Sequence, residues 1–152
     1  MEPTFQESDF IIVDKITPRI WTLHRWDIIV FVPEWKDLPF IKRIIGMPNE
    51  VVKIREGNIY ICEDVDDEID ACNRLVEYYL PNNTFTSTAM CKIDTFDLWE
   101  WFLVLWDNRD RSTDSRCCFW LWCTQDGNYV VYERNLIGKV ALRLYPHLSP
   151  FW

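Results

Sequence analysis

The sequence predicts an all-β or mostly β fold. Short apolar runs rich in β-branched residues are separated by turn residues, and stretches with a helical period are scarce. The 152 residues suffice for one domain with a real core. Because no repeat or low-complexity linker divides the chain, we expect a single domain over residues 1–152, with a looser insertion at about 62–97.

The first strands are expected at residues 9–14, 26–32 and 40–45. Gly46 and Pro48 mark a turn after the third. Residues 51–54 and 58–61 flank a three-residue connection, which is typical of a hairpin. Later strands are expected at residues 102–105, 129–131 and 139–144, and the one plausible short helix is at residues 69–79.

Charge and hydropathy exclude several classes of protein. The chain has 16 basic and 24 acidic residues, and its net charge of −8 argues against a nucleic-acid partner. Its longest apolar run before a turn, residues 28–33, is far shorter than the ~20 residues that span a bilayer. Residues 1–4 lack the features of a signal peptide. As written, the sequence predicts a soluble acidic domain.

The cysteines favour disulfides or buried thiols over a metal site. Six are present, at positions 62, 72, 91, 117, 118 and 123, and an even number permits disulfides in an oxidising compartment. Neither histidine has zinc-ligand spacing to them. The acidic run at residues 63–68 lacks the glycine turn and closing glutamate of a calcium loop, so it is interpreted as a solvated loop. We expect no metal and no cofactor.

Lys42 lies in the middle of an apolar strand. Strand alternation places it on one face with Phe40 and Ile44, and Arg43 on the other face with Ile41. A desolvated lysine loses its proton more easily and can act as a general base near neutral pH. The alternative is an edge-strand lysine whose ammonium group reaches water. A second candidate is the polar segment 107–116, which follows a strand and has the composition of a structured loop.

Four segments, in order, resemble the conserved boxes of type I signal peptidases, the membrane-bound serine proteases that remove signal peptides. Residues 1–5 resemble S-M-x-P-T-L/F, residues 25–31 resemble R-G-D-I/V-V-x-F, and residues 40–48 resemble Y/F-I/V-K-R-V/I-x-G-x-P. Residues 105–116, followed by 137–140, resemble M/L-G-D-N-R-x-x-S-x-D-S-R and I-G-K. The resemblance therefore covers almost the whole chain.

The resemblance implies an antiparallel β-sheet peptidase fold and a serine–lysine dyad that removes N-terminal signal peptides from exported pre-proteins. It also implies an upstream membrane anchor, which places the catalytic domain on the extracytoplasmic side of the bacterial cytoplasmic membrane. Its partners would be signal peptides and the membrane, with no nucleic acid.

The resemblance also implies a role for particular residues. Lys42 would be the general base, and Ser112 would orient it. Two pairs would hold the catalytic loop, Arg43 with Asp107 and Asp114 with Arg116. Shallow pockets for small substrate side chains would be lined by Met1, Phe5 and Ile41. A serine hydroxyl needs a neutral base beside it, and a lysine walled by apolar side chains can be neutral.

The nucleophile departs from the family pattern. In the family the nucleophilic serine immediately precedes the methionine of the first box, which is Met1 here. The serine, the hydroxyl of the oxyanion hole and the anchor are thus expected in an upstream segment absent from a truncated chain. The alternative is a catalytically inactive relative. We expect Lys42 to lie close to Ser112, with Met1 near both.

The tryptophans are a second departure. The chain has 4 glycines and 9 tryptophans, whereas the usual frequency predicts about 11 glycines. Trp26 and Trp106 occupy glycine positions of the boxes, and the others also lie in turn-like or loop-like contexts: Trp21, Trp35, Trp99, Trp101, Trp120, Trp122 and Trp152. The hypothesis is that a codon read as glycine in the source organism, UGA by preference, has been translated as tryptophan. We expect most of these rings at the surface, several residues with positive φ, and Trp106 at or over the substrate cleft.

Two other functions remain open. One is a non-catalytic peptide-binding β domain that keeps the groove without the nucleophile. The other is a relative of the self-cleaving repressor proteases, which share the dyad and fold; the segment 107–116 and the absence of a DNA-binding domain count against it. The codon before Met1 separates the first from a peptidase.

Overall fold

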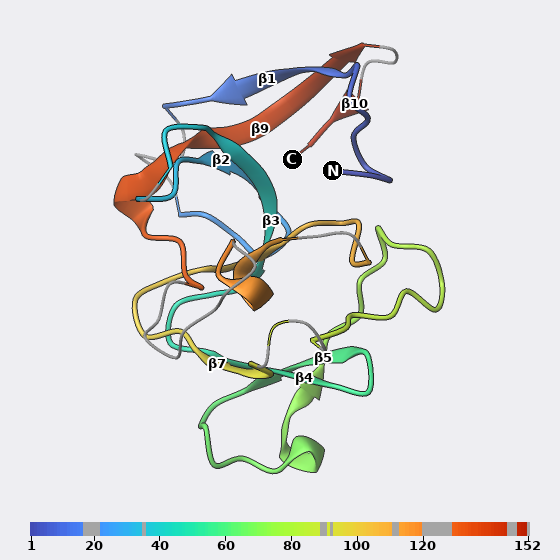
Figure 1. The fold of residues 1–152 in the computed structure, drawn as a ribbon, viewed down its shortest axis with the longest axis vertical. Coiled ribbons are helices and arrows are strands. Elements are labelled where there is room, and N and C mark those ends of the chain that lie inside the picture. The colour runs from blue at the N-terminus through green and yellow to red at the C-terminus, as the bar shows by residue number, and fades with distance from the viewer. Residues whose placement is uncertain are drawn as a thin grey trace.

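The computed structural model describes residues 1–16, 22–34, 36–88, 91, 93–110, 113–119, 129–145 and 149–151. Over these residues the chain forms ten strands and three short 3-10 turns. The strands belong to two antiparallel sheets, which lie at opposite ends of the molecule (Figure 1). The mostly β fold predicted from the sequence is therefore confirmed.

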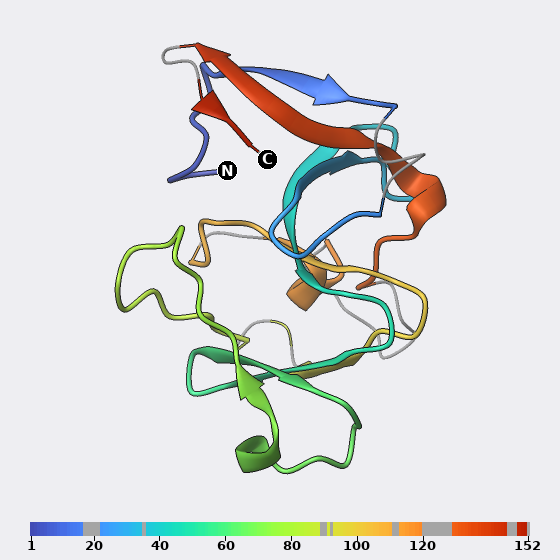
Figure 2. The same cartoon turned by 180° about the vertical axis from the view of Figure 1, so that it is seen from behind.

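The larger sheet contains the first and the last strand of the described chain. Its strand order is β1 (Phe10–Asp14), β9 (Leu136–Tyr145), β2 (Ile28–Phe31), β3 (Phe40–Gly46) and β8 (Leu103–Leu105), and β10 (Ser149–Pro150) pairs with β9. Figures 1 and 2 both show the N-terminus and the C-terminus close together beneath this sheet. The first residues of the chain thus lie beside its last strands.

The smaller sheet has the order β6 (Asn73–Arg74), β5 (Asn58–Cys62), β4 (Val51–Arg55) and β7 (Thr95–Asp97). The turn between β4 and β5 consists of Glu56 and Gly57, whose φ angles are 50° and 78°. Two positive φ angles are the signature of the tight turns that match strand twist in hairpins. The predicted hairpin is present, with a loop one residue shorter than expected. β6 and β7 come from the segment expected as an insertion, and they pair with this hairpin.

Residues 69–79 do not form the expected helix. A single 3-10 turn, η1 (Ile69–Ala71), is followed directly by β6. Asn73 pairs with Ile61 and Arg74 with Tyr60, so strand pairing to β5 replaces the helical period of the sequence. The other two turns are η2 (Ser115–Cys117) and η3 (Glu133–Asn135). At residues 129–131 the described structure has an isolated bridge between Phe102 and Val131 in place of a strand.

Disulfides connect segments that are distant along the chain, and one of them involves Cys62, the last residue of β5. Cys62 is bonded to Cys72 and Cys91 to Cys117, and Cys118 is disulfide-bonded as well. Within the described part of the chain, no group of three His, Cys, Asp or Glu side chains is placed to hold a metal ion. Nor does any helix among these residues have the length and apolarity needed to cross a bilayer.

Candidate active site

Strand β3 positions the two basic residues of the site. Arg43 pairs with Ile28 of β2 on one side and with Leu105 of β8 on the other. Because the chain leaves β8 at Leu105, this register brings Asp107 next to Arg43. Both Lys42 and Arg43 are buried. Lysines and arginines are rarely buried unless they have a specific partner or function.

Arg43 and Asp107 form a two-pronged ion pair. Arg43 Nε donates to Asp107 Oδ1 at 2.9 Å, and Arg43 Nη2 donates to Oδ2 at 2.8 Å. The hydroxyl of Thr4 also donates to Asp107. Arg43 Nη1 donates to the carbonyl of Trp26 at 2.9 Å. This pair therefore connects the N-terminal segment, β3 and the start of the 107–116 loop.

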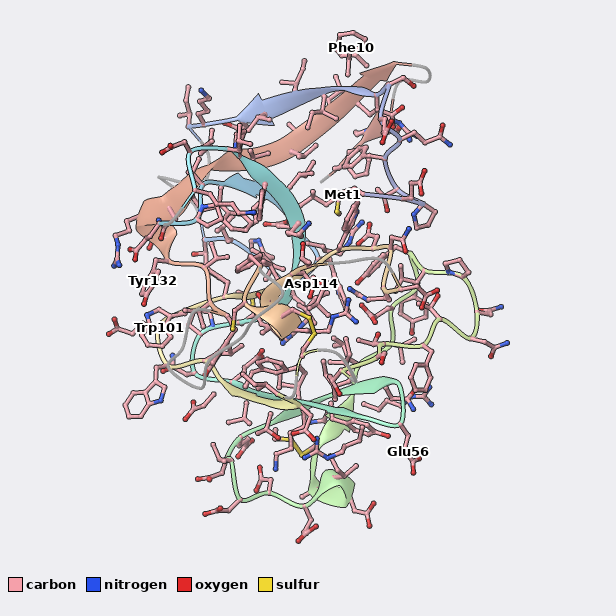
Figure 3. All side chains as sticks on the ribbon, viewed as in Figure 1. Met1, Phe10, Glu56, Trp101, Asp114 and Tyr132 are labelled. Carbon is pink, nitrogen blue, oxygen red and sulfur yellow. A yellow bond between two sulfur atoms is a disulfide. The ribbon has the colours of Figure 1, made fainter. Side chains whose placement is uncertain are left out.

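Asp114 and Arg116 form a second pair at the far end of the loop. Arg116 Nε donates to Asp114 Oδ1 and Arg116 Nη2 to Oδ2, both at 3.0 Å. Asp114 Oδ2 also accepts from the backbone N–H of Trp106 at 3.1 Å, and Arg116 Nη2 donates to the carbonyl of Arg109 at 3.0 Å. Asp114, labelled in Figure 3, is fully buried beside the η2 turn between the two sheets. These bonds fold the loop back on itself.

Lys42 lies in an environment that favours its neutral form. Its side chain is 7% exposed, and its Nζ is 4.3 Å from the centre of the Trp106 ring and 5.6 Å from that of Phe40. Burial, aided by the charge of Arg116, lowers the pKa of Lys42 to about 8, although Asp114 and Asp107 oppose the change. A substantial fraction of Lys42 is thus neutral near pH 8. Ser112, the expected partner of Lys42, lies outside the described residues.

A pocket of about 430 Å³ is lined by Ile41, the neighbour of Lys42 on β3, and by Trp106, whose ring lies over Lys42; Lys42 itself does not line it. The three residues expected to bind substrate, Met1, Phe5 and Ile41, all line the pocket. Ile11 and Trp106 complete its apolar wall. Glu2, Glu7 and Asp9 also line it. Burial, and then the charge of Lys42, lowers the pKa of the Met1 amino group. The N-terminal end of Met1 is therefore close to Lys42, with the pocket in front of it.

The described tryptophans differ in their surroundings. Trp26 has a φ of 78°, is half-buried and packs edge-on against Tyr79. Trp99 is 67% exposed, whereas Trp101 packs against the core instead of projecting into solvent. Trp106 is half-buried over Lys42, and its buried Nε1 has no hydrogen-bond partner in the described structure. Of these four, only Trp26 has the positive φ that was expected for several.

The five other tryptophans lie outside the described residues: Trp21, Trp35, Trp120, Trp122 and Trp152.

Sequence reasoning missed two residues beside the site. Tyr79 places its ring 3.9 Å from the guanidinium carbon of Arg43, and Glu77 forms an ion pair with buried Arg109. Both lie in the segment interpreted as a loose insertion. No local pattern marks them, because their contacts are to residues about 30 or more positions away.

A buried lysine whose pKa is lowered to about 8 can act as a general base near neutral pH. The profile of the family "Signal peptidase, peptidase S26" matches residues 1–145. The chain belongs to this family.

Individual relatives agree with this assignment. The chain is 32% identical over 154 residues to "Probable signal peptidase I-2" of Synechocystis sp. (strain ATCC 27184 / PCC 6803 / Kazusa), covering 96% of this chain and 59% of that protein. It is 29% identical over 146 residues to "Signal peptidase I U" of Bacillus subtilis (strain 168), covering 96% and 71%. The chain thus spans a little under three-fifths of the length of the first relative and about seven-tenths of the second.

A solved structure supports the fold. The crystal structure of a signal peptidase I from Enterococcus faecalis V583 superposes with a TM-score of 0.52 at 24% identity, covering 78% of this chain and 97% of that one. The predicted signal-peptidase-type fold is therefore confirmed.

Proposed function

We propose that this chain is the catalytic domain of an endopeptidase that removes signal peptides from exported pre-proteins, with Lys42 as the general base. The observation that carries the proposal is the buried Lys42, whose pKa is lowered to about 8 and whose neighbours Ile41 and Trp106 line a pocket together with Met1. Membership of the signal peptidase family supports the same activity.

The nucleophile in this proposal is a serine immediately before Met1 in the complete protein. The position is supported by the burial of Met1 in the pocket and by the electrostatic influence of Lys42 on its amino end. A residue joined to the nitrogen of Met1 would therefore lie next to Lys42. Ser112 is proposed to orient the lysine through its hydroxyl, as the family resemblance implies.

The chemistry requires neutral Lys42. It accepts the proton of the serine hydroxyl as the serine oxygen attacks the scissile carbonyl, and it returns that proton to the leaving amine when the C–N bond breaks. The resulting ester is hydrolysed by a water molecule that Lys42 deprotonates, and the proton returns to the serine oxygen. Arg43 with Asp107, and Asp114 with Arg116, hold the loop around the lysine throughout.

The extracytoplasmic location is a further part of the proposal. Disulfides persist in oxidising compartments outside the cytoplasm, and two pairs are present here together with disulfide-bonded Cys118. Phe10 and Ile12 of β1 and Leu144 of β9 are large apolar side chains exposed on the sheet that carries the N-terminus. Figure 3 shows Phe10 pointing away from the molecule at that end. These side chains support a membrane beside that sheet.

The decisive test is proteolysis by the protein expressed from its complete locus. We expect Lys42→Ala to lower cleavage of a pre-protein by a factor of about 10² or more, because the general base is lost. Lys42→Arg should be equally inactive, since a guanidinium does not lose its proton. The exposed Lys15→Ala is the matched control and should cleave normally. Undiminished cleavage by Lys42→Ala would overturn the proposal.

A second candidate, a peptide-binding domain without catalysis, is favoured by one observation. The Trp106 ring lies over Lys42 and takes up room in front of it. Such a domain would bind a signal-sequence peptide in the pocket and release it intact. Intact peptide recovered from the complete protein, with binding weakened by Ile41→Asp, would favour this candidate.

We also propose that positions 26, 99 and 106 carry glycine in the protein as its source organism makes it. Positive φ at position 26 suits glycine, and position 99 is exposed. The indole Nε1 at position 106 is buried and has no hydrogen-bond partner among the described residues. Mass spectrometry of peptides from the native protein tests this directly. Tryptophan at all three positions would refute it.

A further inference from the structure

Tyr79 contacts both sides of the site. The face of its ring lies 3.9 Å from the guanidinium carbon of Arg43, which neighbours Lys42 on β3. Its hydroxyl oxygen accepts a hydrogen bond from Arg109 Nη2 at 3.0 Å. Arg109 belongs to the 107–116 loop, and its side chain is completely buried. Tyr79 therefore connects β3, the strand that carries Lys42, to Arg109 of the 107–116 loop.

Glu77 provides the negative charge for this contact. Its carboxylate accepts from Arg109 Nη2 and from the Tyr79 hydroxyl. Burial raises the pKa of the Tyr79 hydroxyl, so this group remains protonated and can donate to Glu77. Arg109 Nη1 donates to the carbonyl of Trp106 at 2.9 Å, which extends the network to the residue above Lys42. A buried arginine without such a carboxylate is strongly unfavourable.

We propose that Glu77 and Tyr79 are positioning residues that clamp the 107–116 loop onto β3 and keep water away from Lys42. The proposal rests on the function proposed for Lys42. Neither residue lines the pocket that contains Met1, so both would act through Arg43 and Arg109 and not through the substrate. The segment between β6 and β7, which contains both residues, would thus support the position of the catalytic loop.

The clamp predicts the direction in which the pKa of Lys42 changes when the clamp is lost. The charged groups that act on Lys42 are Asp114, Asp107 and Arg116 of the loop. Burial is the largest cause of its lowered pKa. A loosened loop admits water, and the pKa of Lys42 should then rise toward the ordinary value of lysine.

The experiment compares Tyr79→Phe and Glu77→Gln with matched controls in the complete protein. Tyr79→Phe keeps the ring on Arg43 and removes only the hydroxyl. The controls are Tyr78→Phe, at a neighbouring side chain that is 91% exposed, and Glu68→Gln, at an exposed carboxylate. The pKa of Lys42 is measured by NMR on protein with isotope-labelled lysine, and amide exchange is followed in residues 107–110.

We expect both clamp variants to increase the proton affinity of Lys42 by about threefold or more and to speed amide exchange in the loop. Their kcat should fall by about tenfold with little change in KM, because no substrate contact is removed. Glu77→Asp keeps the negative charge, so its Lys42 pKa and its kcat should both lie closer to those of the parent than the values of Glu77→Gln do. A simple loss of folded protein would not move the pKa of Lys42 in the folded fraction.

The proposal is overturned if the clamp variants fold and match the Tyr78→Phe and Glu68→Gln controls in Lys42 pKa and loop exchange. These two measurements do not depend on peptide cleavage. If they respond as expected but no variant, including the parent, cleaves a pre-protein, the clamp stands and the proposed function fails.

Discussion

The Nζ of Lys42 lies 4.3 Å from the centre of the Trp106 indole ring. The ring covers an amine that the proposed reaction requires to be accessible to substrate, and it contributes to the burial that lowers the pKa of Lys42 to about 8. The residue at position 106 therefore affects both access to the base and its charge.

Trp106→Gly should open the site. Removing the indole hydrates Lys42, so its pKa should rise above about 8. Relative to a complete protein that carries tryptophan at position 106, kcat/KM for a pre-protein should increase by about tenfold or more, because space is restored in front of the base. Trp99→Gly, at an exposed ring that does not line the pocket, is the control and should change neither quantity. Slower cleavage by Trp106→Gly would contradict the proposed role of the indole as an obstruction.

Lys42→Met should stabilise the fold in a pH-dependent way. The pKa of Lys42 is about 8 in the folded state against 10.5 for an ordinary lysine, so the unfolded state binds more protons between these values. Charged Lys42 therefore costs about 3 kcal/mol below pH 8, and this cost disappears above pH 10.5. Urea unfolding should show that the advantage of Lys42→Met over the parent shrinks by that amount between pH 7 and 10.5. The same comparison for exposed Lys15→Met should be flat with pH.

At position 26, glycine should be more stable than alanine. Both substitutions remove the indole and its contact with Tyr79, so their difference isolates the backbone. At a φ of 78° we expect Trp26→Gly to unfold with a free energy about 1 kcal/mol higher than Trp26→Ala. At position 99, which lacks positive φ, the glycine variant should be no more stable than the alanine variant. Equal stability of the two variants at position 26 would argue against a glycine position there.

The Cys91–Cys117 disulfide should matter for the site, and Cys62–Cys72 should not. The Cys91–Cys117 disulfide joins cysteines that are 26 positions apart in the sequence, and the Cys62–Cys72 disulfide joins cysteines that are 10 positions apart. Replacing each pair by alanines should cost about 3.5 and about 2.7 kcal/mol of unfolding free energy respectively. Cys117 directly follows Arg116, so only loss of the first pair should also accelerate amide exchange in the 107–116 loop. Equal exchange in the two double variants would show that this disulfide does not hold the loop.

Much of the fold could be predicted because short apolar runs bounded by turn residues are a local property of the sequence. The apolar runs around Ile28, Ile44 and Val52 each became a buried strand, and Gly57 marked the hairpin turn. The segment around Ile69 was predicted incorrectly because its pairing partner, β5, lies elsewhere in the chain. A strand of two residues has too little local pattern to compete with a helical period.

For the site, the sequence by itself determined that Lys42 stands in an apolar strand, that a polar loop follows a later strand, and that both match the boxes of one family. The resemblance already implied the pair of Arg43 and Asp107, and only the tertiary structure decided that this pair is buried and that Trp106 lies over Lys42. It also revealed that Glu77 and Tyr79 reach the loop. The physical reason is that burial and ion pairing depend on residues brought together by antiparallel pairing of distant strands, whereas residue type and spacing are fixed along the chain.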